Sequence, residues 1–156
     1  MRVARALLAA ALLAAVACRH PAPPAPAPAA PAAATPAGPS LYTRLGGLDA
    51  IHAVVRDFLR RVAADARINA FFRGVDTDTL AARLADQICQ VSGGPCRYTG
   101  RSMRQAHADL NVTNADFDAL VEDLAASLDH FDVGTRERGE LLQVLGGLRK
   151  QIVTGR

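Results

Sequence analysis

The sequence is poor in aromatic residues and has no large excess of either charge. Its 156 residues include five Phe, two Tyr and no Trp, and the formal net charge is +3. Two basic residues, Arg2 and Arg5, stand near the start, and without them 16 basic residues face 15 acidic ones. No stretch combines basic residues with interleaved aromatic ones, so the composition gives no indication of a nucleic-acid partner.

The sequence also has no apolar run long enough to cross a membrane as a helix. Residues 7–16 are apolar throughout, but a spanning helix needs about 20 such residues. Basic residues precede this run, and Ala15, Val16 and Ala17 end it with small side chains. This order is typical of a secretory signal, and we expect residues 1–17 to be a signal peptide.

The residue after this signal, Cys18, resembles the lipid acceptor of bacterial lipoproteins. Ala15 stands where such signals usually carry Leu, and the alternative is an ordinary signal cut near Ala17 with Cys18 incidental. Several acyl chains on one cysteine would anchor the protein stably. Arg19 is not the Asp that often retains lipoproteins at the inner membrane. We expect a protein anchored in the bacterial cell envelope and facing the periplasm, with the outer membrane favoured.

Proline is concentrated in one segment, residues 19–39. Eight of the nine prolines occur there, mixed with alanine. Such a segment cannot bury a core, and its prolines favour an extended polyproline II conformation. At about 3.1 Å per residue it would hold a domain roughly 60 Å from its anchor. Residues 40–156 are then the candidate for a folded domain.

Residues 40–156 lack the long alternation of apolar and polar residues that is typical of strands. Their apolar residues recur instead at spacings of three and four, which places them on one face of a helix. Four such stretches cover residues 48–62, 80–91, 117–131 and 141–152. Asp76 and Thr113 precede the second and third as helix caps, and Gly146 and Gly147 weaken the fourth. The pattern predicts an all-α fold.

A shorter helix is expected between the second and third stretches. Ser102 and Gln105 have the spacing of a capping box, and the helix would run for about two turns, from Met103 to Leu110. His107 falls on its apolar face. A lone histidine there is most often a core residue, but a neutral imidazole in an apolar setting is also a good ligand for haem iron.

Several short segments resemble group I truncated haemoglobins in their residues, their order and their separation. Together they extend over residues 40–153. The segments are SLYTRLGG at 40–47, INAFFRG at 68–74, GGP at 93–95, YTGRSM at 98–103 and AH at 106–107. The resemblance implies a two-over-two helical sandwich around haem b, with His107 as the axial ligand of the iron.

The resemblance also implies which side chains surround the haem. Phe72 corresponds to a phenylalanine that packs on the haem, and Phe117 would lie beneath it on the side of the iron ligand. The other expected contacts are Phe71, Leu80, Leu84, Ile88, Tyr98 and Met103. Phe71 and Phe72 would otherwise be ordinary core residues.

The opposite, distal side departs from the pattern of many group I members. These carry Tyr after the Phe of the first long helix and Gln on the next helix, whereas this chain has Leu59 after Phe58, and Leu84. Both hydrogen-bond donors are missing, so the predicted distal pocket of Phe58, Leu59 and Leu84 is apolar. Gln87 or Arg83 would restore a donor by turning inward, and the alternative is that both face solvent.

An apolar distal pocket favours reversible binding of a diatomic gas, O2, NO or CO. A donor near the iron stabilises O2 more than the less polar NO and CO. The alternative function is that of a haem enzyme for NO dioxygenation or peroxidase-like chemistry, for which we assign no catalytic residue and no redox partner. A second alternative is a helical interaction module without haem.

If Cys18 carries a lipid, Cys89 and Cys96 remain. An even number of cysteines in an oxidising compartment favours a disulfide, and the turn at Gly93, Gly94 and Pro95 would bring the two together. The alternative is a pair of free thiols.

Overall fold

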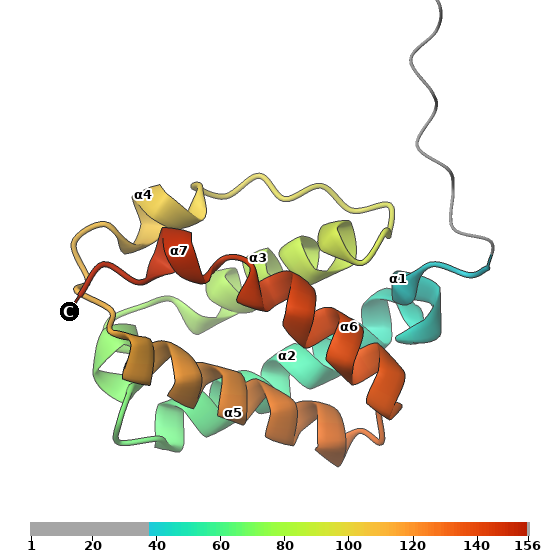
Figure 1. Ribbon diagram of the computed structural model, residues 1–156, viewed down its shortest axis with the longest axis horizontal. Coiled ribbons are helices and arrows are strands. Elements are labelled where there is room, and N and C mark those ends of the chain that lie inside the picture. Colours follow the sequence, from blue (N-terminus) through green and yellow to red (C-terminus); the bar gives the residue numbers. More distant parts are fainter. Residues whose placement is uncertain (1–37, 156) are drawn as a thin grey trace, which may run out of the picture. The chain divides into compact units, whose positions relative to one another are not determined.

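The computed structural model describes residues 38–155, and these residues form helices and no strands (Figure 1). The predicted signal peptide, Cys18 and nearly all of the spacer lie outside them. In chain order the elements are α1 (Leu41–Arg44), α2 (Gly47–Ala64), the 3-10 helix η1 (Asn69–Phe72), α3 (Thr77–Val91), α4 (Met103–His107), α5 (Asn114–His130), α6 (Thr135–Gly146) and α7 (Arg149–Ile152). None of these described helices is both long enough and apolar enough to cross a membrane. The predicted all-α fold is confirmed.

Polar side chains fix the starts of three of these helices. Asp76 accepts two backbone N–H groups at the start of α3. Complete capping boxes begin α4 at Ser102 and α5 at Thr113. Such caps satisfy amide groups that have no partner inside the helix. The three predicted caps are confirmed.

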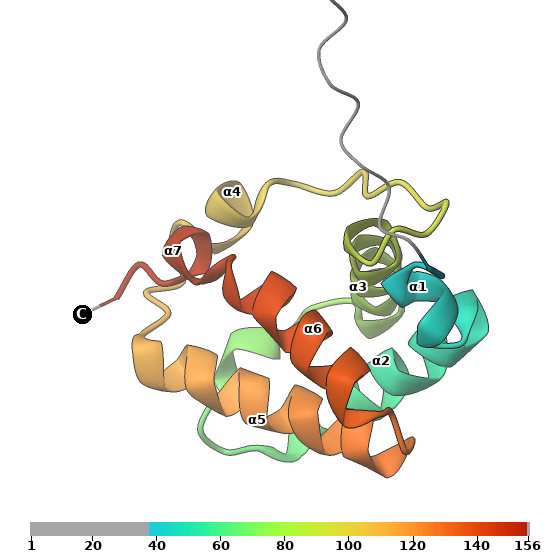
Figure 2. The ribbon, with the colours of Figure 1, turned by 45° about the vertical axis from the view of Figure 1, so that its right-hand side comes forward.

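The long helices are arranged as two pairs. α2 packs along α3 and also contacts α5, which packs against α6. In Figures 1 and 2, α2 lies behind α5 and α6, while the short helices α4 and α7 lie together at the end of the domain far from α1. Two helices thus cross over two others, and α4 belongs to neither pair.

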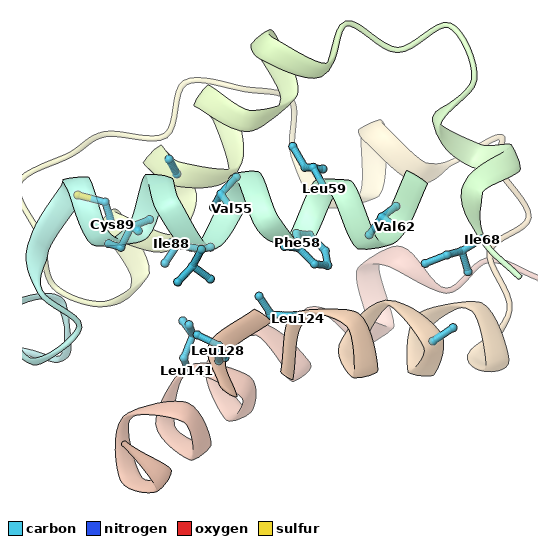
Figure 3. Close-up of a cluster of buried hydrophobic side chains, with 14 residues drawn as sticks. Val55, Phe58, Leu59, Val62, Ile68, Ile88, Cys89, Leu124, Leu128 and Leu141 are labelled. Atoms are coloured by element: carbon cyan, nitrogen blue, oxygen red, sulfur yellow. The ribbon is translucent and has the colours of Figure 1, made fainter. Parts of the chain in front are cut away.

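The main core lies where α2 meets α3, α5 and α6 (Figure 3). The predicted apolar face of α2 supplies much of it: Ile51, Val54, Val55, Phe58, Leu59 and Val62. The partners from the other three helices include Ile88, Cys89, Leu124, Leu128 and Leu141. Because a fully buried aliphatic side chain contributes about 2 kcal/mol, this face of α2 is the main source of stability.

The last predicted helix is in fact two helices. α6 ends at Gly146 and α7 begins at Arg149, because two consecutive glycines each cost a helix about 1 kcal/mol relative to alanine. The break brings α7 against α4, where Ile152 packs with Val112 and Phe117 in a second apolar cluster. The prediction of one continuous helix is wrong there.

The helix that carries His107 is shorter than predicted. α4 ends at His107 itself, and Leu110 is 40% exposed instead of facing inward. The chain turns at Asn111, whose φ of 52° lies in the left-handed region and cannot continue a right-handed helix. The elements α1 and η1 are too short to have been predicted from periodicity.

Candidate haem site

One ring nitrogen of the half-buried His107 is hydrogen-bonded to the backbone. Its Nδ1 lies 2.7 Å from the carbonyl oxygen of Met103. A carbonyl oxygen only accepts hydrogen bonds, so Nδ1 carries the hydrogen, and in the neutral imidazole Nε2 then has the lone pair. A bond of this kind fixes the ring orientation of a metal-binding histidine. His107 therefore has the hydrogen arrangement that an iron ligand needs.

A cavity of about 320 Å³ lies between the end of α2, η1 and the start of α3. Three predicted site residues line it, namely Leu59, Phe72 and Leu80. The lining residues that sequence reasoning missed are Val62, Ala63, Asn69, Arg73, Val75 and Thr77. Val62 belongs to an apolar stripe, and Asn69 and Arg73 lie in the INAFFRG segment at 68–74, but their place in the lining was not predicted. His107 does not line this cavity and comes from a different part of the fold.

Phe58 and Leu59 point to opposite sides of α2 (Figure 3). Phe58, only 6% exposed, belongs to the core on the side that faces α5, whereas Leu59 lines the cavity. With 3.6 residues per turn, neighbouring positions on a helix point about 100° apart. The structure therefore places Leu59, and not Phe58, in the lining of the cavity.

Three more predicted haem contacts lie in or beside the core. Leu84 and Phe71 are half-buried and pack against it, and Phe71 also contacts the second cluster. Ile88 is 5% exposed and faces Leu128 and Leu141 around a separate small hollow. Ile88 is thus a core residue and does not line the cavity.

Gln87 points toward α4. Its side-chain amide donates to Sδ of Met103 at 3.4 Å, a contact that links α3 to α4. Because Gln87 is half-buried, it does not simply face solvent. Arg83 is exposed, and its guanidinium donates to the hydroxyl of Thr99. Neither residue supplies a donor to the cavity lining.

Tyr98 and Phe117 lie on either side of α4 in the sequence and support it differently. The Tyr98 hydroxyl donates to the carbonyl oxygen of Arg101 at 2.8 Å, within the loop that leads into α4. Phe117, only 4% exposed, packs in the second cluster, which Met103 also contacts. The guanidinium of Arg149 lies 4.3 Å from the centre of the Phe117 ring. Met103 and Phe117 thus share one apolar environment beside the iron-ligand candidate.

Cys89 and Cys96 form a disulfide that joins the end of α3 to the following loop, with their Cα atoms 5.7 Å apart. Gly94 lies inside this loop. A Cβ at Gly94 would come within 2.7 Å of Sγ of Cys89 and 2.5 Å of Cδ2 of Tyr42, so the turn requires glycine there. The predicted disulfide is present.

Proteins of known family match this chain over most of its length. The bacterial-like globin family matches residues 40–154. A group 1 truncated haemoglobin from Tetrahymena thermophila is 36% identical over 72% of this chain and 93% of its own length. The chain belongs to the truncated haemoglobins. A group 1 member from Mycolicibacterium paratuberculosis is 34% identical over 74% of this chain and 85% of its own length.

Solved structures of other truncated haemoglobins share the fold. The Fe(III) form from Tetrahymena pyriformis is 35% identical, with a TM-score of 0.72 over 76% of this chain and 100% of its own. The 2/2 haemoglobin from Synechococcus sp. PCC 7002, in the cyanomet state with covalently attached haem, is 34% identical, with a TM-score of 0.71 over 74% of this chain and 98% of its own. The two-over-two arrangement is confirmed, and haem with iron is the cofactor of this family.

The described residues of this truncated haemoglobin fit a haem. His107 keeps a free lone pair on Nε2, as an axial ligand must. Leu59, Phe72 and Leu80 give the cavity an apolar wall suited to a porphyrin. Asn69, Arg73 and Thr77 add polar groups to the lining, and of these Arg73 and Thr77 are exposed.

Proposed function

We propose that this truncated haemoglobin reversibly binds a diatomic gas, O2, NO or CO, at haem iron held by His107. The observation that carries the proposal is the bond between Nδ1 of His107 and the carbonyl oxygen of Met103, which leaves Nε2 available to iron. Haem iron, when bound, supplies the open coordination position that such a gas occupies. The residues of the chain decide which gas is favoured.

The apolar wall supports gas binding ahead of NO dioxygenation or peroxidase-like chemistry. Leu59 and Leu80, which line the cavity, and the nearby Leu84 have no hydrogen-bond donor. Gln87, the one half-buried donor considered for this pocket, is bonded to Met103. The polar lining residues of the cavity are Asn69, Arg73 and Thr77, so the argument applies to the wall that the leucines form. A wall without a donor stabilises bound O2 less than one that offers a hydrogen bond.

Optical spectra of the haem-loaded full chain and of His107→Ala test this proposal. The ferric, ferrous and ferrous-CO states are compared, with His130→Ala, an exposed histidine at the end of α5, as the control. We expect the spectrum of a histidine-ligated globin in the wild type and in His130→Ala, and its loss in His107→Ala. Failure to take up haem, or a spectrum indifferent to His107, would contradict the proposal and favour the helical interaction module.

We propose further that a lipid on Cys18 holds the domain at the bacterial cell envelope, facing the periplasm. The signal-like composition of residues 1–17 supports this location. The disulfide between Cys89 and Cys96 supports it as well, because such bonds persist in oxidising compartments such as the periplasm. Residues 19–39 would then serve as the spacer between the membrane and the haem domain.

A further inference from the structure

The residues after α7 lie against the turn that follows His107. The backbone N–H groups of Thr154 and Gly155 both donate to the carbonyl oxygen of Val112, at 3.0 and 2.9 Å. Val112 is only 7% exposed, so these bonds lie at the edge of the second apolar cluster. The hydroxyl of Thr154 lies 3.5 Å from the carbonyl oxygen of His107. One short segment is thus bonded to both ends of this turn.

Gly155 occupies its place because it has no side chain. A Cβ there would overlap the carbonyl oxygen of Asn111 and come within 3.2 Å of Cγ2 of Thr113. The first of these contacts is with backbone, which cannot rotate away as a side chain can. Asn111 itself adopts a left-handed conformation, so its carbonyl is oriented by the turn. A larger residue at position 155 must displace either the turn or the segment that crosses it.

α4 cannot hold His107 in place by itself. It has only five residues, and isolated helices of that length are unstable in water. Its main helical contact is α7, and Met103 and Ile152 meet in the cluster beside them. The position of the imidazole therefore depends on what fixes the two ends of α4. At its start these are the capping box at Ser102 and the bond from Gln87 to Met103, and at its end the segment formed by residues 153–155.

We propose that Thr154 and Gly155 are positioning residues that set the orientation of the His107 imidazole and, through it, the strength of its bond to iron. The inference rests on the proposed function, since it requires iron on Nε2. Loss of the bonds to Val112 lets the turn after His107 shift, and the ring shifts with the backbone that carries it. Removing an outer support of a ligand histidine typically costs about 10- to 100-fold in metal affinity.

The test compares Gly155→Ala with Gly139→Ala in the haem-loaded full chain. Both substitutions add one methyl group, but a Cβ at Gly139, on α6, meets no atom within 4 Å. We expect Gly155→Ala to lower and broaden the iron–histidine stretching band in resonance Raman spectra of the ferrous protein. Haem release to a scavenging protein should become about 10-fold faster. Gly139→Ala should keep both wild-type values.

Two substitutions at Thr154 give an answer even where Gly155→Ala does not fold. Thr154→Val removes the hydroxyl beside the His107 carbonyl at nearly constant size, and Thr154→Ser retains it. A band shifted in the valine variant and restored in the serine variant supports the positioning role. A wild-type band and haem-release rate in every folded variant would overturn it. A wild-type spectrum that does not depend on His107 would instead remove the proposed function, and this inference with it.

Discussion

Among the residues that line the cavity, Leu59 is the one whose substitution should most directly change which gas is bound more tightly. It lines the cavity, is 7% exposed and carries no donor. We expect Leu59→Tyr to slow O2 dissociation about 10-fold, because one added hydrogen bond contributes roughly 1.4 kcal/mol. Stopped-flow measurement of O2 release checks this, with CO release expected to change little. Leu59→Phe adds the ring without the hydroxyl, and equal O2 rates in the two variants would contradict the prediction.

Asp123, on α5, is a half-buried carboxyl group whose position lowers the stability of the folded state. Its Oδ2 is buried and has no hydrogen-bond partner among the described residues. Burial, followed by the charge of nearby Asp65, raises the pKa of Asp123 above its usual range. A raised pKa in the folded state means that ionisation is harder there than in the unfolded chain. Folding stability is therefore reduced at neutral pH, and this loss disappears as the pH falls through the folded-state pKa toward the ordinary value.

We expect Asp123→Asn to raise the free energy of unfolding at pH 7 by about 1 kcal/mol, because the amide removes a poorly solvated charge. The gain should shrink at acidic pH, once the pH has fallen through the raised folded-state pKa of Asp123 and the wild-type carboxyl has taken up its proton. Urea unfolding at the two pH values measures both effects, with the exposed Asp109→Asn as control. An equal gain at both pH values, or a loss at pH 7, would argue against this account of Asp123.

On the scale of helices and loops, the disulfide fixes the end of α3 relative to the loop that leads to α4. We expect replacement of both Cys89 and Cys96 by alanine to lower the free energy of unfolding by about 2 kcal/mol, because the unfolded chain is no longer constrained. Urea unfolding without reductant measures the difference. Wild-type protein treated with a dithiol serves as the control and should approach the double variant. Equal midpoints of variant and oxidised wild type would refute the prediction.

The helices that sequence reasoning recovered are those whose signals are local. Asp76 and Thr113 are N-caps that mark the starts of α3 and α5, and the spacing of the apolar residues then defines each buried face. The end of α4 and the break between α6 and α7 depend instead on contacts between distant residues. Ile152 packs against Phe117, and Gly155 fits against Asn111, and neither pairing leaves a periodic pattern in the sequence.

The residues of the candidate site also divide into those with a local sequence signal and those whose place depends on contacts between distant parts of the chain. Leu59, Phe72 and Leu80, which the family resemblance assigns to the haem site, line the cavity, and they belong to contiguous motifs or apolar stripes. The resemblance grouped Phe58 with Leu59, although the helical turn sends the two side chains to different sides of α2. Asn69 belongs to the segment at 68–74 that carries the resemblance, but its place in the lining was not predicted, because only the meeting of α2, η1 and α3 forms that surface.

On the scale of the whole molecule, the proposed anchor determines where the haem domain resides. We expect Cys18→Ser to move the protein from the membrane fraction to the soluble fraction of bacterial cells, because serine has no thiol to accept the lipid. Immunoblots of fractionated cells check this, and Cys96→Ser, which leaves the acceptor intact, should remain with the membranes. An unchanged distribution in Cys18→Ser would exclude lipidation as the cause of membrane association.

Because Cys89 and Cys96 form a disulfide, the chemical state of a protein sample depends on the compartment in which it was produced. A chain produced in a reducing compartment would carry free thiols, whereas the same chain in an oxidising compartment would carry a closed covalent loop. The two preparations have one sequence but differ chemically at the end of α3, the helix whose first residues line the cavity. A thiol titration of the sample therefore belongs beside each measured gas-binding rate.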